Sequence, residues 1–452
     1  DHGAYNDSAG VLIAGYARYT GFPYSIPNVR GLVRVANTNH NFGTAYRGFG
    51  SPQSYTCSES MIDMLAEKMG MDPFEFRALN VARPGDLTIN NRPYRECNMV
   101  KLMDMMRPYW EEAKARLSGK ETDETYFGVG ISCGGFNVTI GPNDRAEIAL
   151  ELNPDGTVTH FNTWEDPGQG GDIGSLVHAH KALAPLGLRP DQIRLMMNDT
   201  HLCPNTGIAA ASRSHFMAGY ATIDAADKLM DAMRKPDGTF RTYDEMAAEH
   251  IPVKYVGVYD TTGTCEDLDP NTGEGDPVQS VTYGIFLAEV EVEKKTGKVS
   301  VTREVAVGDI GVIGSVQAVE GQAYGGISHT IGYALKENYD DLHKHRNIAG
   351  AGIPYIEDVP DDIRLIFHEH KREIGPHGST GCSELFQSGG HVAVLNAIHD
   401  AIGQRIYTLP ASPEKVKAAI DATLRGETIE QARYFLGNDM YEVLDEIERN
   451  PV

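Results

Sequence analysis

The sequence contains no apolar run of the roughly 18 residues that a membrane-spanning helix needs. Basic residues are also in short supply, because 40 lysines and arginines stand against 63 aspartates and glutamates, for a formal net charge of −23. Nucleic acids and anionic membranes bind to basic surfaces, so this charge argues against both as partners. We expect a protein that acts on neither.

Cysteine is scarce and scattered. None of the six cysteines forms a CxxC pair with another, so we expect neither a zinc ribbon nor an iron–sulfur cluster held by this chain alone. Six cysteines are too few for a disulfide scaffold, and reduced thiols in a cytoplasmic protein are the simpler interpretation. The pairs His343/His345 and His368/His370 have no third ligand at a usual spacing, which argues against a zinc site.

The first residues, Asp1-His2-Gly3, include no initiator Met and no signal-peptide pattern. We therefore expect a chain that was processed or that starts partway through a longer protein. Apolar residues recur with helical spacing in 53–82, where Gly70 ends one helix and Asp72-Pro73 begins the next, with Asp72 as its cap. They recur again in 99–118, and a polar, aperiodic stretch follows. This pattern predicts a first domain over 1–124, incomplete at its N-terminus, and a second over 125–452.

Strand patterns dominate after residue 124, so the expected fold class is α+β. Residues 146–163 and 288–302 each alternate like a hairpin around a Gly-containing turn, and the two read alike. Each is followed by a Gly-Gln loop and a helix-like run. The pattern favours an internal duplication, 125–275 and 276–452, although two unrelated amphipathic hairpins would look the same.

Four segments have the composition of ligand-binding loops. Residues 45–53 combine an arginine with flanking glycines before a helix, and 165–172 present a glutamine between glycines. Residues 204–214 place small and hydroxyl side chains before another helix-like run, which suits a phosphate. Taken singly, each also reads as an ordinary glycine-rich turn or a tightly packed helix start.

The fourth segment, 378–387, contains a glutamate, Glu384, between small and apolar residues. A carboxyl group in such surroundings has a raised pKa and can act as a general base. The alternative is an acidic residue that merely favours the start of a helix.

In this order, the four segments resemble the molybdenum-binding region of the xanthine oxidase and aldehyde oxidoreductase family. The chain is also similar to the bacterial aldehyde oxidoreductases between these segments, for example in 26–31, 63–73 and 405–411. The resemblance runs over essentially the whole chain. It implies the C-terminal half of an elongated molybdenum-binding part, built from duplicated hairpin and helix units.

The resemblance also implies roles for individual residues. Arg47 matches the arginine that holds the phosphate region of the cofactor near the metal, Phe49 matches an aromatic residue of the substrate pocket, and Glu384 matches the catalytic base. The other implied cofactor contacts are Ala45, Tyr46, Gly168, Gln169, Gly170, Ala210, Ala211, Ser212, Arg213 and Gln322.

The implied cofactor is molybdopterin with molybdenum, in its cytosine dinucleotide form. Because the pterin holds the metal, no protein side chain need ligate it. The implied reaction converts an aldehyde to a carboxylic acid with water as the oxygen source and Glu384 as the base. The implied partners are a segment or chain that completes the molybdenum site, an iron–sulfur domain or subunit that removes the electrons, and in some members a flavin subunit.

Some features depart from the family pattern. The glycine-rich loop that lies beside the metal in the family precedes the first residue of this chain, so we do not expect activity from the chain alone. Pro167 replaces a frequent histidine, and Cys382 and Ser383 replace a frequent Val-Gly before Glu384. Purine oxidases carry a substrate-binding arginine near the position where this chain has Gly15, and this difference argues against xanthine as the substrate. A hydroxylase of N-heterocycles and a non-catalytic subunit remain alternatives, and the intact polar positions favour an enzyme over the latter.

Overall fold

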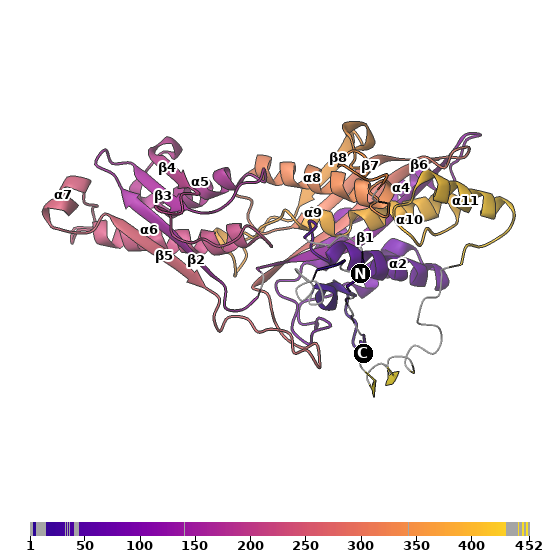
Figure 1. Cartoon of the computed structure of the whole chain (residues 1–452), viewed down its shortest axis with the longest axis horizontal. Coiled ribbons are helices and arrows are strands. Elements are labelled where there is room, and N and C mark those ends of the chain that lie inside the picture. Colours follow the sequence, from indigo (N-terminus) through magenta and orange to yellow (C-terminus); the bar gives the residue numbers. More distant parts are fainter. Residues whose placement is uncertain are drawn as a thin grey trace.

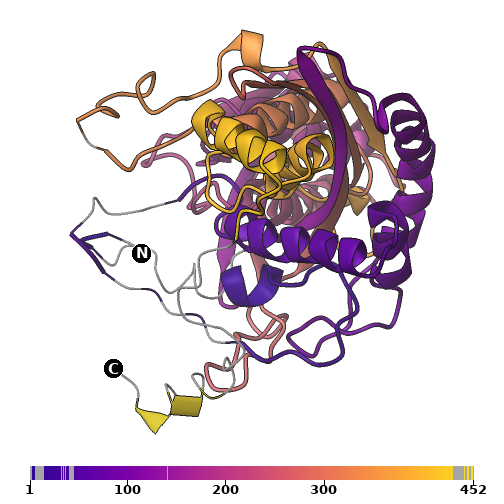
Figure 2. The same cartoon turned by 90° about the vertical axis from the view of Figure 1, so that its right-hand side faces the viewer.

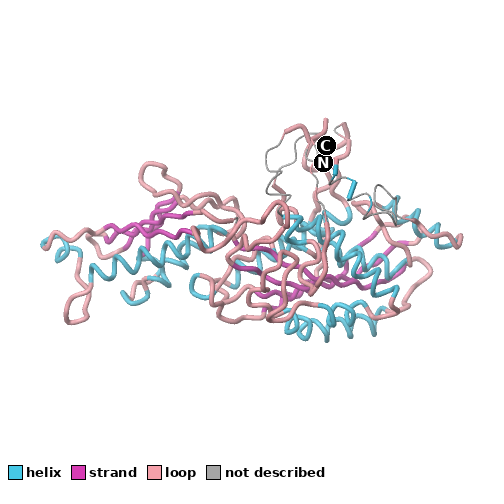
Figure 3. Tube along the Cα trace, turned by 90° about the horizontal axis from the view of Figure 1, so that it is seen from below, coloured by secondary structure: helices cyan, strands magenta, loops and turns pink. Residues whose placement is uncertain are grey.

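The computed structural model describes residues 3–5, 15–31, 33, 35, 37–39, 45–139, 141–341 and 343–430, together with 442, 445, 446, 449 and 450. It is an elongated molecule in which two mixed sheets with their own helices follow one another along the long axis (Figures 1 and 3). The expected α+β class is confirmed. Of the helices in the described part of the chain, none has the length and apolar character needed to cross a membrane.

The larger sheet has the strand order β1-β6-β7-β8. Its strands are β1 (Thr125–Val138), β6 (Ser280–Glu293), β7 (Val299–Asp309) and β8 (Asp362–Phe367). Strand β6 runs antiparallel to both β1 and β7, and β8 pairs in parallel with β7. The pairing of β1 with β6 continues through the whole of both strands, which makes it the longest ladder among the described strands.

Helices cover both faces of this larger sheet (Figure 2). One face shares an apolar core with helices from the first 117 residues, and the other shares a second core with helices from the C-terminal third. The first group is α2 (Ser51–Lys68), α3 (Pro73–Asn80) and α4 (Met99–Leu117); the second is α8 (Val316–Leu335), α9 (Leu385–Ser388), α10 (Gly390–Ile402) and α11 (Pro413–Leu424).

The smaller sheet has the order β4-β3-β2-β5 and packs on its own helices. Its strands are β2 (Arg145–Leu152), β3 (Val158–Asn162), β4 (Ile193–Met197) and β5 (Lys254–Asp260). Its helices are α5 (Gly171–Ala182), α6 (Gly219–Met233) and α7 (Tyr243–Ala248). One turn of π-helix, η3 (Ser214–Ala218), leads into α6.

The two sheets share one topology. In each, an antiparallel hairpin is followed by a helix and a strand parallel to the second hairpin strand, then by another helix. The fourth strand is β5 in the smaller sheet and β1 in the larger sheet, antiparallel to the first hairpin strand. The similar hairpins of the sequence therefore occupy equivalent places. Strand β1, however, lies in the larger sheet rather than with the unit expected over 125–275, and the domain boundaries themselves stay a prediction.

Each fourth strand meets its helix at glycines. A Cβ atom on Gly130 of β1 would lie 2.2 Å from the carbonyl oxygen of Ala393 in α10. A Cβ atom on Gly257 of β5 would lie 2.0 Å from the carbonyl oxygen of Ala221 in α6. Real Cβ atoms do not approach this closely, so the helix lies directly on the strand backbone. The contact fixes the position of α10, whose N-terminus follows Glu384 closely in the sequence.

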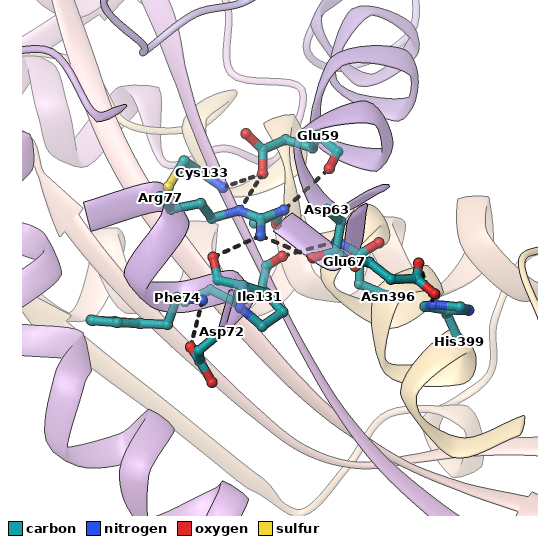
Figure 4. A network of polar contacts seen from close by, with 12 residues as sticks. Glu59, Asp63, Glu67, Asp72, Phe74, Arg77, Ile131, Cys133, Asn396 and His399 are labelled. Atoms are coloured by element: carbon teal, nitrogen blue, oxygen red, sulfur yellow. Dashed lines mark hydrogen bonds and ion pairs between the residues drawn. The ribbon is translucent and has the colours of Figure 1, made fainter. Parts of the chain in front are cut away.

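A buried ion-pair network joins α2 and α3 to the segment after α10 (Figure 4). Arg77 lies 2.9 Å from Glu59 and 2.9 Å from Asp63, and Arg405 lies 2.9 Å from the second oxygen of Asp63. Glu59 also accepts a hydrogen bond of 3.0 Å from the backbone N–H of Cys133 in β1. The network therefore links helices from the first third of the chain to the central strand layer and to the C-terminal third.

Candidate active site

Arg47 lies in a tight turn before α2. The glycines on either side of its neighbour Phe49 have positive φ angles, 92° at Gly48 and 90° at Gly50, which glycine adopts without strain. The guanidinium donates from Nε to the carbonyl oxygen of Ser383 at 2.7 Å and from Nη2 to that of Gln322 at 2.8 Å. Arg47 therefore ties together three segments that are distant in the sequence.

Glu384 lies at the N-terminal end of α9, with its side chain partly buried. Burial raises the pKa of this carboxyl to about 7, although hydrogen bonds from the backbone amides of Gly48 and Ala211 and the charge of Arg47 lower it. The two amides come from two different loops, 45–50 and 204–213. A carboxyl with a pKa near neutrality can accept a proton at physiological pH and release it again.

The loop 204–213 approaches the Glu384 segment very closely. Ala211 and Ser212 have left-handed backbone conformations, with φ angles of 47° and 57°. A Cβ atom on Gly381 would lie 2.2 Å from Cβ of Ser212, so only glycine fits at position 381. The carbonyl oxygen of Ala211 accepts a 2.9 Å hydrogen bond from the N–H of Thr139. These contacts hold Ala211 and Ser212 against the segment that carries Glu384.

Arg213, in the same loop, is buried and paired within the protein. Its guanidinium donates to the two carboxylate oxygens of Asp144 at 2.6 and 2.8 Å, and also to backbone carbonyl groups that include that of Ile208, at 3.2 Å. Its implied contact with the cofactor stays a prediction, and this geometry favours a contact through the loop backbone. No pattern in the sequence pointed to Asp144 as the partner of Arg213, because the two residues are far apart in the chain.

The loop 165–172 leads into α5. Gly168 and Gly170 have φ angles of 110° and 87°. The carboxylate of Asp166 accepts hydrogen bonds from the amides of Gly168, Gly170 and Asp172 at 2.9 to 3.1 Å. Asp166 therefore occupies two amides of the loop and one amide in the first turn of α5, which leaves fewer amides there for a phosphate. An aspartate two residues before a glycine is a recognisable turn signal that the sequence interpretation missed.

One polar atom of Gln169 has no hydrogen-bond partner among the described residues. Its amide nitrogen donates to the carbonyl oxygen of Glu165 at 2.7 Å, whereas its Oε1 is buried with no hydrogen-bond partner in the described structure. A buried carbonyl oxygen without a partner is costly. The atom therefore fits a donor on a bound group, such as the ring N–H or amino group of a pterin. The donor set of this loop fits a cofactor better through Gln169 than through the helix amides.

The two aromatic residues beside Arg47 take different positions. The Tyr46 hydroxyl lies 3.3 Å from a carboxylate oxygen of Glu337, and its ring is 5.8 Å from that of His329 on α8. Phe49 is partly buried in the turn itself, with its N–H bonded to the carbonyl oxygen of Tyr46. Sequence reasoning did not find Glu337, which lies after the end of α8 in no recognisable motif.

The structure brings Arg47, Gln322, Ala211, Ser212 and Glu384 together as one cluster. In the described parts of the chain, no hydrogen bond joins the loop around Gln169 to Arg47 or to Glu384. Within those parts, no group of three His, Cys, Asp or Glu side chains is arranged to hold a metal ion. Thus the residues gathered here suit a ligand bound by amides and a guanidinium.

Comparison with known proteins identifies the ligand class. Residues 104–360, more than half of the chain, match the family model of the molybdopterin cofactor-binding domain, and residues 1–81 match a second model with the same description. Aldehyde oxidoreductase of Megalodesulfovibrio gigas is 40% identical over 422 residues, which are 93% of this chain and 46% of that protein. The chain thus spans about half the length of this relative.

The chain also resembles solved structures over 93% of its length. Aldehyde oxidoreductase from Desulfovibrio desulfuricans is 45% identical with a TM-score of 0.90, over 93% of this chain and 46% of that one. Quinoline 2-oxidoreductase from Pseudomonas putida 86, at 23% identity and a TM-score of 0.77 over 93% of this chain and 59% of that one, shares the fold. The chain therefore belongs to the molybdopterin cofactor-binding domain family and corresponds to the molybdenum-binding region of the xanthine oxidase and aldehyde oxidoreductase proteins.

Proposed function

We propose that this chain is the molybdenum-binding portion of an oxidoreductase that hydroxylates aldehydes to carboxylic acids with water as the oxygen source. The observation that carries the proposal is the convergence on Glu384. A carboxyl with a pKa of about 7 is held between two loop amides and beside Arg47, in a fold shared with aldehyde oxidoreductases. Such a carboxyl is suited to act as a general base near neutral pH.

In the proposed reaction, the residues of this site have different roles. Oxidation of an aldehyde by water to a carboxylic acid releases two electrons and two protons. Glu384 accepts a proton from the water-derived oxygen as that oxygen adds to the aldehyde carbon. The amides of Gly48 and Ala211 hold the carboxylate in place. When bound, the molybdenum cofactor supplies the two-electron acceptor for the step. Phe49 forms part of the wall that orients the substrate.

The proposal includes the cytosine dinucleotide form of the cofactor. Arg47, the Gln169 loop, the backbone of 210–213 and Gln322 would hold it. Because the chain spans about half the length of its aldehyde oxidoreductase relatives, other segments or chains would complete the site. Iron–sulfur clusters on one of them, with or without a flavin subunit, would carry the electrons away.

The test is metal and cofactor analysis of the purified native assembly, followed by turnover with an aldehyde and an artificial electron acceptor. We expect about one molybdenum for each copy of the chain and release of cytidine monophosphate on acid hydrolysis. If the assembly contains tungsten in place of molybdenum, only the identity of the metal in the proposal changes. If it turns over purine or nicotinate rather than aldehydes, the proposed substrate class is wrong. An assembly with neither metal nor pterin would overturn the proposal.

The pKa of Glu384 predicts the pH dependence. A general base works when deprotonated, so kcat/KM should be half-maximal near pH 7, because the carboxyl has a pKa of about 7. Below that pH the rate should fall about tenfold per pH unit. The measurement is a kcat/KM profile from pH 5 to 9 (roughly the range over which such a base titrates). A profile that stays flat down to pH 5 would exclude Glu384 as the base in the free enzyme.

Arg47→Ala should lose cofactor before it loses the fold. The guanidinium makes hydrogen bonds to Ser383 and Gln322 but lies in a loop, so its removal takes little apolar packing. We expect molybdenum content to fall by about tenfold, as for a lost charge-assisted contact of about 1.4 kcal/mol or more, with unchanged circular dichroism. Arg189→Ala, which removes an exposed arginine paired with Asp191, is the matched control. Full molybdenum occupancy in Arg47→Ala would contradict the assigned role.

A further inference from the structure

Three histidines of the described structure form a cluster outside the residues that the proposed chemistry uses. His178 comes from α5, His215 from the π-helix η3, and His377 from the turn before the Glu384 segment. The ring centroids of His178 lie 4.6 Å from those of His215 and 5.7 Å from those of His377. The cluster thus joins the smaller sheet's helices to the segment that carries Glu384.

We propose that His215 is a positioning residue that, through Ser379, ties the loop of Ala211 to the loop of Glu384 and so keeps the Ala211 amide on the Glu384 carboxylate. The inference deepens the proposed function, on which the catalytic meaning of Glu384 rests. Its direct evidence is one hydrogen bond, of 2.7 Å, between Nε2 of His215 and Oγ of Ser379.

The direction of this hydrogen bond follows from its neighbours. The Ser379 hydroxyl donates its only hydrogen to the carbonyl oxygen of Pro376 at 3.1 Å, so it accepts from Nε2–H of His215. A neutral His215 then has a bare Nδ1, which accepts from Nε2–H of His178 at 3.2 Å. The result is a chain of donors that runs one way, from His178 through His215 and Ser379 to Pro376.

The surroundings keep this chain neutral. Burial, and then the nearby His377, lower the pKa of His215 to about 4. Burial and the neighbouring imidazoles of His215, His377 and His160 hold the pKa of His178 well below its usual range. Burial, and then the charge of Lys181, lower the pKa of His377. All three shifts favour neutral rings with one N–H each, and with such rings the chain of donors runs in this one direction.

Ser379 is well placed to position Glu384. After it, Thr380 donates from its N–H to the carbonyl oxygen of Ile310 at 3.0 Å, and Gly381 lies against Ser212. On the other side, His215 follows the left-handed residues Ala211 and Ser212 by only a few positions. Two successive non-glycine residues in that conformation persist only where surrounding contacts hold them. The His215–Ser379 bond is such a contact, and it spans both loops.

The test uses the complete enzyme that contains this chain. The variants are Ser379→Ala, His215→Ala, their combination, and His215→Gln, whose amide can still donate. Ser175→Ala is the control, because it removes a buried hydroxyl from α5 that has no hydrogen-bond partner among the described residues. The measured quantity is the pKa of the Glu384 carboxyl, from infrared difference titration with Glu384→Gln as the reference, beside the acid limb of kcat/KM.

Loss of the Ala211 hydrogen bond, which lowers the pKa of Glu384, should raise that pKa by roughly one unit. Activity at pH 7 should then fall about fivefold, and the acid limb should move to higher pH by the same roughly one unit. Both alanine variants should give this shift and the double variant no more, because each breaks the same bond. His215→Gln and Ser175→Ala should stay near wild type.

An unshifted Glu384 pKa in Ser379→Ala, or shifts that add in the double variant, would overturn the inference. If His215→Ala does not fold, Ser379→Ala decides alone, because it removes only one hydroxyl, with its bonds to His215 and to Pro376. The infrared titration needs no turnover. An assembly without molybdenum chemistry would therefore overturn the proposed function while this test of His215 still gives its answer.

Discussion

Glu384→Gln should abolish turnover while the cofactor stays bound. Glutamine is nearly isosteric with glutamate, and its amide oxygen can still accept from the backbone amides of Gly48 and Ala211 that hold the carboxylate. It cannot accept a proton. Removal of a general base costs about 100- to 10,000-fold in rate, and the loss lies at the upper end where the same group orients the reacting oxygen.

The measurement is reduction of the molybdenum centre by an aldehyde in a stopped-flow experiment, with wild type and variant at equal metal content. Glu304→Gln is a matched control. Glu304 on β7 is fully buried with no hydrogen-bond partner in the described structure, and burial holds the pKa of its carboxyl well above the usual range. Burial therefore favours the uncharged form of this carboxyl, which glutamine resembles. A Glu384→Gln enzyme reduced within tenfold of the wild-type rate would remove Glu384 from the role of base.

Arg77→Met should lower the free energy of unfolding more than any of the other substitutions proposed. The arginine is completely buried, and its nitrogens lie 2.9 Å from both Glu59 and Asp63 (Figure 4). Methionine fills a similar volume but leaves Glu59 buried without its ion-pair partner. Removing one member of a buried ion pair costs about 3–5 kcal/mol of the free energy of unfolding.

The measurement is urea unfolding followed by circular dichroism. Arg107→Met serves as the control, because Arg107 pairs with Glu75 at the surface and such pairs contribute at most about 1 kcal/mol. The double variant Arg77→Met/Glu59→Gln should recover part of the loss, since it neutralises the carboxylate that was left unpaired. A cost below about 1 kcal/mol for Arg77→Met would show that the network is replaceable.

The sequence was sufficient to predict those elements whose structure depends on residues close together in the chain. Helix α3 begins at Pro73 with Asp72 as its cap, which accepts from the amides of Phe74 and Glu75 as the Asp-Pro pair predicts. The hairpins were found for the same reason, since their turns and alternation lie within one short segment. Helix α4 also spans nearly the residues expected from its apolar spacing.

Pairings between distant segments were not predictable from the residues. Strand β1 pairs with β6, far away in the chain, and its glycines break the alternation that marks a strand. The guanidinium of Arg213 is occupied by Asp144, a partner that no spacing rule connects with it. The convergence of Arg47, Gln322 and Glu384 was expected only from the family resemblance, because each of the loops, read alone, could be an ordinary turn.

The glycine contacts between strand and helix restrict how this sequence can diverge. At Gly130 and Gly257 any side chain would collide with helix backbone, which cannot rotate away as a side chain can. No other amino acid fits at either position unless the whole helix moves. The paired glycines that seat α6 and α10 on the strands should therefore be among the slowest positions of the chain to change.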